Sequence, residues 1–135
     1  MRYDTTRHAK FRLRYHVIFV TKYRYDCLSK PVQAVIRQSF LDSRTDDFDI
    51  ELCEFDDTKP NHVHLLISAT PNVAPYQIVA RLKQYSTYSV WQQIPQIMSK
   101  AYWRNKHYLW TRGYFVCSIG DASEATIRKY IENQG

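Results

Sequence analysis

Apolar and polar residues alternate in two stretches of the chain, the pattern of a β-strand with one buried face. Between residues 11 and 21, an apolar side chain recurs at every second position: Phe11, Leu13, Tyr15, Val17 and Phe19. Residues 48–52 repeat the alternation, and residues 62–68 and 114–119 are rich in branched and aromatic residues. The sequence therefore predicts four strands.

Apolar residues three or four positions apart predict helices between these strands. Ser29 is placed to cap the first helix, and Pro31 suits its first turn. A second helix should follow Pro75, and Pro95 should interrupt it. Asp121 followed by Glu124 resembles a capping box that starts a last helix. The expected apolar stripes are Val32, Val35, Ile36, Phe40 and Leu41 in the first helix and Ile78, Val79, Leu82, Tyr85 and Val90 in the second.

The predicted order is β-α-β-β-α-β-α, which favours an α+β fold. Four antiparallel strands with helices on one face form a ferredoxin-like sandwich, and the last helix is an addition to it. A length of 135 residues with 44% apolar residues suits one domain spanning residues 1–135.

The sequence also indicates where the protein is located and what its cysteines do. The sequence has no apolar run near the ~20 residues of a membrane helix and no secretory signal, so we expect a cytoplasmic protein. Cys27, Cys53 and Cys117 are odd in number and widely separated, which predicts reduced packing residues rather than disulfides or a thiolate zinc site.

Charge and aromatic content favour a nucleic-acid partner. The formal net charge is +6, and aromatic residues make up 15% of the chain, with eleven tyrosines. Basic side chains neutralise phosphates, and aromatic rings stack on unpaired bases. Residues 23–25 (Tyr-Arg-Tyr) and 102–104 (Tyr-Trp-Arg) combine both properties, although aromatic residues also serve as ordinary core.

Two histidines and a tyrosine are the candidates for chemistry. His62 and His64 are two apart in a predicted strand, so both imidazoles project from the face opposite Val63 and Leu65 and can share a metal ion. Two hydrogen-bonded or solvent-facing histidines are the alternative. Tyr130 and Gln134 are one helical turn apart and share a face, but a core tyrosine also fits that stripe.

Several segments together resemble a known family over nearly the whole chain. They are Lys22-Tyr23-Arg24, His62-Val63-His64-Leu65-Leu66, Trp110 with Gly113-Tyr114-Phe115, and Tyr130 through Gln134. In this order and spacing they resemble the single-tyrosine HUH transposases, the IS200-like TnpA enzymes of small insertion sequences. The chain departs from the family pattern at Asn61, where an aspartate is common.

The resemblance implies a metal-dependent transposase that cuts and rejoins single-stranded DNA at hairpin-marked ends. Tyr130 would be the nucleophile and form a 5′-phosphotyrosine, while His62, His64 and Gln134 would bind Mg²⁺ or Mn²⁺. The family also implies a homodimer with shared active sites. From the residues alone, two histidines suit zinc or another transition metal equally well.

Other functions stay open on the sequence. A replication-initiator-like nickase would use the same residues, and a noncatalytic nucleic-acid-binding module could share the fold. A metallohydrolase would need a general base, and Glu54, Asp56 and Asp57 precede the histidine pair. The candidate DNA contacts are Lys22, Tyr23, Arg24, Arg81 and Lys83, although each also fits ordinary solvated surface charge.

Overall fold

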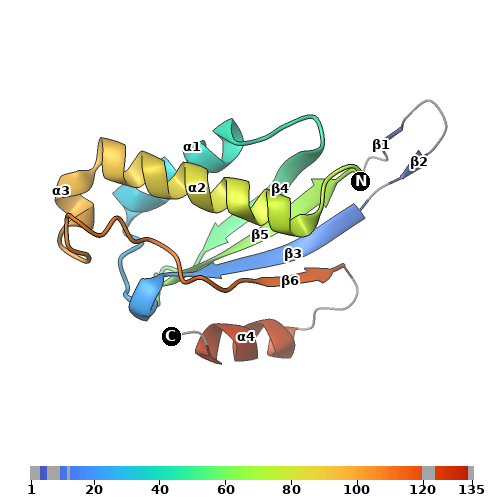
Figure 1. Ribbon diagram of the computed structural model, residues 1–135. Helices are drawn as coiled ribbons and strands as arrows, with labels where there is room; N and C mark the ends of the chain where they lie inside the picture. Colours follow the sequence, from blue (N-terminus) through green and yellow to red (C-terminus); the bar gives the residue numbers. More distant parts are fainter. Residues whose placement is uncertain (1–3, 6–9, 12, 120–123, 134–135) are drawn as a thin grey trace.

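The centre of the molecule is a four-stranded antiparallel sheet (Figure 1). The computed structural model describes residues 4–5, 10–11, 13–119 and 124–133. The sheet order is β4-β5-β3-β6. Its strands are β3 (Leu13–Val20), β4 (Phe48–Phe55), β5 (His62–Ala69) and β6 (Phe115–Ser118).

The connections between the strands are those of a ferredoxin-like sandwich, as predicted. The chain runs β3-α1-β4-β5-α2-β6. In the sheet, β3 lies between β5 and β6, and β4 and β6 form the edges. Helices α1 (Lys30–Asp42) and α2 (Pro75–Gln93) cover one face, and α4 (Glu124–Asn133) lies against the other (Figure 1). The α+β fold with an additional C-terminal helix is confirmed.

The main core fills the space between the sheet and helices α1 and α2. The strand side chains that face these helices are almost fully buried: Val17, Phe19, Val63, Leu65 and Ile67. Their helical partners include Val32, Ile36, Phe40, Ile78 and Leu82. Because β5 alternates strictly, burial of Val63 and Leu65 leaves His62 and His64 on the opposite face.

The structure corrects several expected boundaries. The first main strand begins at Leu13, because Phe11 pairs instead with Asp4 in a ladder of β1 (Asp4–Thr5) and β2 (Lys10–Phe11). Ser29 occupies the N-cap position of α1, but its side chain makes no capping hydrogen bond. After Ile94, the chain resumes as the single turn α3 (Pro95–Met98). Asp121, the expected cap of the last helix, lies outside the described residues.

Two sequence-based expectations concern membrane-spanning helices and the cysteines. In the part of the chain that the structure describes, no helix is long and apolar enough to cross a membrane. Cys27, Cys53 and Cys117 are half-buried thiols without a disulfide. Burial raises the pKa of Cys53 to about 11, which keeps that thiol protonated and unreactive near neutral pH.

Candidate active site

His62 and His64 project from the open sheet face, which α4 partly covers. Both imidazoles are half-buried, while Val63 and Leu65 point into the core. His64 pairs with Glu54 of β4 on one side and with Ile18 of β3 on the other. Directly paired residues of neighbouring strands face the same way, so this cross-strand row brings a carboxylate beside the imidazole.

The His62 ring is held by the residue that departs from the family pattern. Its Nδ1 lies 2.8 Å from Oδ1 of Asn61, and an amide oxygen only accepts, so Nδ1 donates its hydrogen. The lone pair then resides on Nε2, the atom suited to a metal ion. Asn61 is itself 5% exposed and anchored through its backbone to Thr21 and Lys59. Burial lowers the pKa of His62, which favours the neutral, metal-binding imidazole.

His64 contacts a third histidine that the sequence reasoning missed. Its Nε2 lies 2.9 Å from Nδ1 of His16 on β3. The ring centroids are 5.1 Å apart with the planes inclined by only 22°. The centroid separation exceeds the N···N distance by about two ring radii, so the rings meet edge to edge, as in an N–H···N hydrogen bond. Burial, and then the neighbouring His16, lower the pKa of His64.

Tyr130 lies on the same side of the sheet as the imidazoles but does not project into solvent. Its ring packs against Phe115 of β6 at a centroid distance of 5.3 Å. The hydroxyl is buried and has no hydrogen-bond partner among the described residues. Burial raises the pKa of this phenol to about 12. The side chain is therefore a neutral phenol, shielded from water, in this conformation.

The strand register relates Tyr130 to the histidine pair. Ile18 pairs with both His64 and Phe115, so these three residues form one row across the open face. Two strand spacings separate the backbones of His64 and Phe115, roughly 10 Å. Tyr130 packs on Phe115, at the β6 end of this row, and α4 also contacts β3. The phenol makes no hydrogen bond to either imidazole in this conformation.

A hollow of about 390 Å³ lies between His62 and the outer side of α4. Its basic residues come from three elements: Arg24 from η1 (Lys22–Arg24), Lys59 from the turn before β5, and Arg128 from α4. Arg24 also donates a hydrogen bond of 2.6 Å to the carbonyl oxygen of Glu132, which ties η1 to the end of α4. The remaining lining residues are Asp56, Asn61, His62, Ile131 and Glu132. Three cations beside an imidazole suit a phosphodiester.

The described residues supply two histidines for a divalent metal ion but not a third ligand. His62 presents a lone pair on Nε2, whereas Nε2 of His64 is engaged with Nδ1 of His16 in this conformation. Gln134, the expected third ligand, lies outside the described residues. Within those residues, no group of three histidine, cysteine or acidic side chains is arranged to hold an ion. A third ligand must therefore come from elsewhere, such as an amide, water or the DNA itself.

Two of the candidate DNA contacts are engaged in hydrogen bonds within the protein. Lys83 donates hydrogen bonds to the carbonyl oxygens of Thr111, Arg112 and Gly113, at 2.8, 3.0 and 3.0 Å. All three of its hydrogens are used, so none is left for a phosphate. Arg81 bonds the Ser43 carbonyl at the end of α1 and the Tyr85 hydroxyl. Sequence reasoning could not separate these cations from Arg24, which does line the candidate site.

The aromatic segments around residues 23–25 and 102–104 meet in space. Tyr23, Tyr25, Tyr102, Trp103 and Tyr108 line one hollow of about 400 Å³ together with Ala101 and Lys106. Tyr102 is 3% exposed and belongs to the core, whereas Trp103 is 79% exposed. The expected pairing of rings with basic residues is thus present at one place on the surface.

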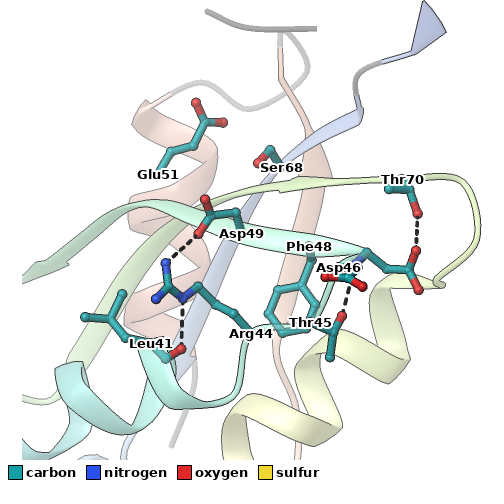
Figure 2. A pocket seen from close by; sticks show the side chains of 10 residues that line it. Leu41, Arg44, Thr45, Asp46, Phe48, Asp49, Glu51, Ser68 and Thr70 are labelled. Atoms are coloured by element: carbon teal, nitrogen blue, oxygen red, sulfur yellow. Dashed lines mark hydrogen bonds and ion pairs between the residues drawn. The ribbon is translucent and has the colours of Figure 1, made fainter. Parts of the chain in front are cut away.

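A separate hollow at the far end of β4 has the opposite charge (Figure 2). Its lining includes Asp46, Asp47, Asp49 and Glu51. Hydrogen bonds and ion pairs occupy three of these carboxylates, as Arg44 bonds Asp49, Thr70 bonds Asp47 and Arg14 bonds Glu51. Four carboxylates repel a polyanion, so this hollow is unsuited to DNA.

Comparisons with known proteins agree with this arrangement. A family model described as "Transposase IS200 like" matches residues 9–134. The chain is 32% identical over 124 residues to the ISDra2 transposase TnpA of Deinococcus radiodurans, covering 92% of this chain and 85% of that protein. A crystal structure of a putative transposase from the same organism superposes with a TM-score of 0.79 at 27% identity, covering 97% of both chains.

A more distant structure shares the fold. It is a REP-associated tyrosine transposase bound to a REP hairpin, with a TM-score of 0.54 and 13% identity. The alignment covers 98% of this chain and 69% of that one. The sandwich with its additional helix therefore occurs in known tyrosine transposases.

Proposed function

The chain belongs to the family of IS200-like transposases, and on that premise we propose that it cuts single-stranded DNA at hairpin-marked ends and rejoins it through Tyr130. The observation that carries the proposal is the shared sheet face: His62 and His64 project from the side of the sheet on which the Tyr130 ring packs, beside a basic hollow. The neighbour of known structure that binds a hairpin has the same fold, which supports a hairpin as the DNA feature.

In the proposed reaction, Tyr130 Oη attacks the scissile phosphorus. A new bond forms between that oxygen and phosphorus, and the bond between phosphorus and the 3′ oxygen breaks. The phenol loses its proton, and the departing 3′ oxygen gains one, which leaves a 3′ hydroxyl and a 5′-phosphotyrosine. Because the phosphoester is conserved, a 3′ hydroxyl from another end can reverse the step and join the strands.

His62 and His64 would hold the metal, with Gln134 as third ligand. A divalent ion such as Mg²⁺ or Mn²⁺, when bound, would polarise the scissile phosphate and favour in-line attack. Arg24, Lys59 and Arg128 would bind the DNA backbone around that phosphate. The role of Asn61 would be to hold the His62 ring with Nε2 directed toward the site.

A homodimer with shared active sites is part of the proposal. The phenol packs against its own β6 and not in the hollow beside His62. Either α4 moves within one subunit, or α4 of a partner completes the histidine site. Mixing His62→Ala with Tyr130→Phe subunits distinguishes these routes, because only exchange between subunits restores one intact site.

The test of the reaction is covalent capture of DNA. A labelled single-stranded hairpin oligonucleotide with the flanks of the element end, incubated with the protein and Mn²⁺, should give an adduct that survives denaturation. Tyr130→Phe should abolish the adduct, whereas Tyr88→Phe, a change on the exposed side of α2, should not. An undiminished adduct from Tyr130→Phe would reject the assignment.

The alternatives predict different results in the same assay. A nickase would yield the adduct but no rejoined strands, and a noncatalytic binding module would yield neither. A metallohydrolase would still cut in Tyr130→Phe. Two of the three candidate bases are engaged elsewhere: Asp56 accepts hydrogen bonds from the Thr58 and Lys59 amides, which lower its pKa, and Asp57 pairs with Lys30. Glu54, which pairs with His64 in the strand register, is the base that such an enzyme would use.

A further inference from the structure

Two adjoining hollows flank Tyr25 on the side of η1 away from His62. The first is the aromatic hollow of about 400 Å³ described above. The second, of about 710 Å³, shares Tyr25 and Ala101 with it and continues past Ile97 and Lys100. Three rings along this groove are exposed: Trp103 at 79%, Tyr23 at 52% and Tyr25 at 45%. Such rings offer free faces on which a planar group can stack.

Two of the exposed rings, those of Tyr23 and Tyr25, pack on a buried tyrosine. Beneath them Tyr102 is buried, its ring lying 5.5 Å from that of Tyr25, and its hydroxyl donates to the Lys22 carbonyl at 2.8 Å. Thr21 Oγ1 donates to the Tyr25 carbonyl at 2.7 Å. Preformed rings lose little freedom when a ligand stacks on them, which favours binding.

The backbone at this place is strained. Tyr23 and Arg24 have φ of 62° and 54°, and within the described residues they are the non-glycine positions with positive φ. This left-handed conformation costs free energy for residues with a Cβ atom, and it persists where the surroundings enforce it. Its effect is to expose the Tyr23 ring while Arg24 reaches Glu132 and the hollow beside His62.

The charges around the groove suit a phosphate backbone. Lys22 Nζ lies 5.3 Å from the Tyr23 ring centroid and 5.1 Å from that of Tyr108. Lys106 lines the first hollow, and Lys100 lines the second. Asp26 is the acidic residue in the lining of the second hollow. Aromatic faces interleaved with lysines are the features by which proteins hold unpaired nucleotides.

We propose that Tyr23, Tyr25 and Trp103 form a stacking site for an unpaired base of single-stranded DNA. Tyr23 and Arg24 are consecutive, with Cα atoms about 3.8 Å apart, so the groove begins one residue away from the candidate catalytic hollow. From this adjacency we expect the stacked base one or two nucleotides from the phosphate at His62. That placement rests on the proposed function, whereas the stacking site itself does not.

Tryptophan fluorescence tests the stacking site directly. Trp91 and Trp110 are 6% and 8% exposed, so quenching by a bound base reports on Trp103. Oligo(dT) of about ten nucleotides should quench the wild-type signal, and Trp103→Phe should remove the quenching. By anisotropy of labelled oligo(dT), Tyr23→Ala and Trp103→Ala should each weaken binding on the order of tenfold. The matched control Tyr88→Ala, 68% exposed on α2, should bind like wild type.

Three results would overturn the proposal: unchanged oligo(dT) affinity in both Tyr23→Ala and Trp103→Ala, equal quenching by a duplex of the same length, or quenching by oligo(rU) but not oligo(dT).

Including Tyr130→Phe separates this proposal from the catalytic one. That variant should bind and quench normally, so loss of its DNA adduct leaves the stacking result intact. In a cleavable hairpin substrate, 2-aminopurine should be quenched most at one or two nucleotides from the cut; a maximum farther away would overturn the placement.

Discussion

Nε2 of His64 lies 2.9 Å from Nδ1 of His16, on the side of His64 away from His62. The strand register fixes this direction, because His16 pairs with Leu66 while Ile18 pairs with His64 and Val20 with His62. A metal ion bound through Nε2 of His64 would have to displace this contact. With that coordination, His16 competes with the metal for His64.

Removing His16 should strengthen metal binding. In His16→Leu, metal binding by His64 no longer costs the hydrogen bond to His16. One hydrogen bond corresponds to roughly a threefold to tenfold gain in Mn²⁺ affinity. Isothermal titration or electron paramagnetic resonance measures that affinity. His107→Leu, which removes a histidine stacked on Trp91, is the control and should leave it unchanged. Weaker Mn²⁺ binding by His16→Leu would instead make His16 a support of the metal site.

Asn61 should matter for metal binding through His62. Asn61→Ala removes the oxygen that accepts the Nδ1 hydrogen, and loss of such a partner typically lowers metal affinity about 10- to 100-fold. Asn61→Asp keeps an acceptor and should bind Mn²⁺ at least as well as wild type. Equal affinities for Asn61→Ala and wild type, measured by the same titration, would show that the ring does not need this anchor.

The buried Tyr130 phenol predicts a measurable alkaline shift. Its pKa is raised from 10.0 to about 12 by burial, so the folded protein retains a proton that the unfolded chain has lost between these values. The free energy of unfolding should consequently fall as the pH rises through this window. The difference in phenolate absorbance between wild type and Tyr130→Phe isolates this group during an alkaline titration. A midpoint near 10 would mean that the phenol is exposed in solution.

Lys83 and Lys59 should separate stability from DNA binding. Lys83→Met deprives three carbonyl oxygens of their donor and should lower the free energy of unfolding by about 1–3 kcal/mol in urea. The affinity of the folded variant for oligo(dT) should stay within about twofold. Lys59→Met, in the hollow beside His62, should weaken oligo(dT) binding and leave the free energy of unfolding unchanged. Reduced DNA affinity in folded Lys83→Met would restore it as a DNA contact.

The sequence predicted the elements whose patterns are local. The branched apolar residues of 62–68 identified the strand, and the side-chain period of two identified the face that carries His62 and His64, opposite the buried Val63 and Leu65. The ferredoxin-like order also followed, since short connections between alternating strands and helices leave few arrangements.

Contacts between distant strands could not be predicted in the same way. The bond between His16 and His64 depends on the register of β3 against β5, which a single sequence does not specify. Likewise, Lys83 and Arg24 look alike as basic residues, and only the fold shows that one bonds three carbonyls and the other lines the site. The metal-ligand role of Gln134 and the dimer stay predictions.

The central claim is that Tyr130 and the histidine pair act on one phosphate. Mass spectrometry of the protease-digested DNA adduct tests it most directly. We expect the 5′-phosphate on the peptide that contains Tyr130, with its formation lost in His62→Ala combined with His64→Ala. Attachment of the DNA to any other residue, or an undiminished adduct without the two histidines, would contradict it.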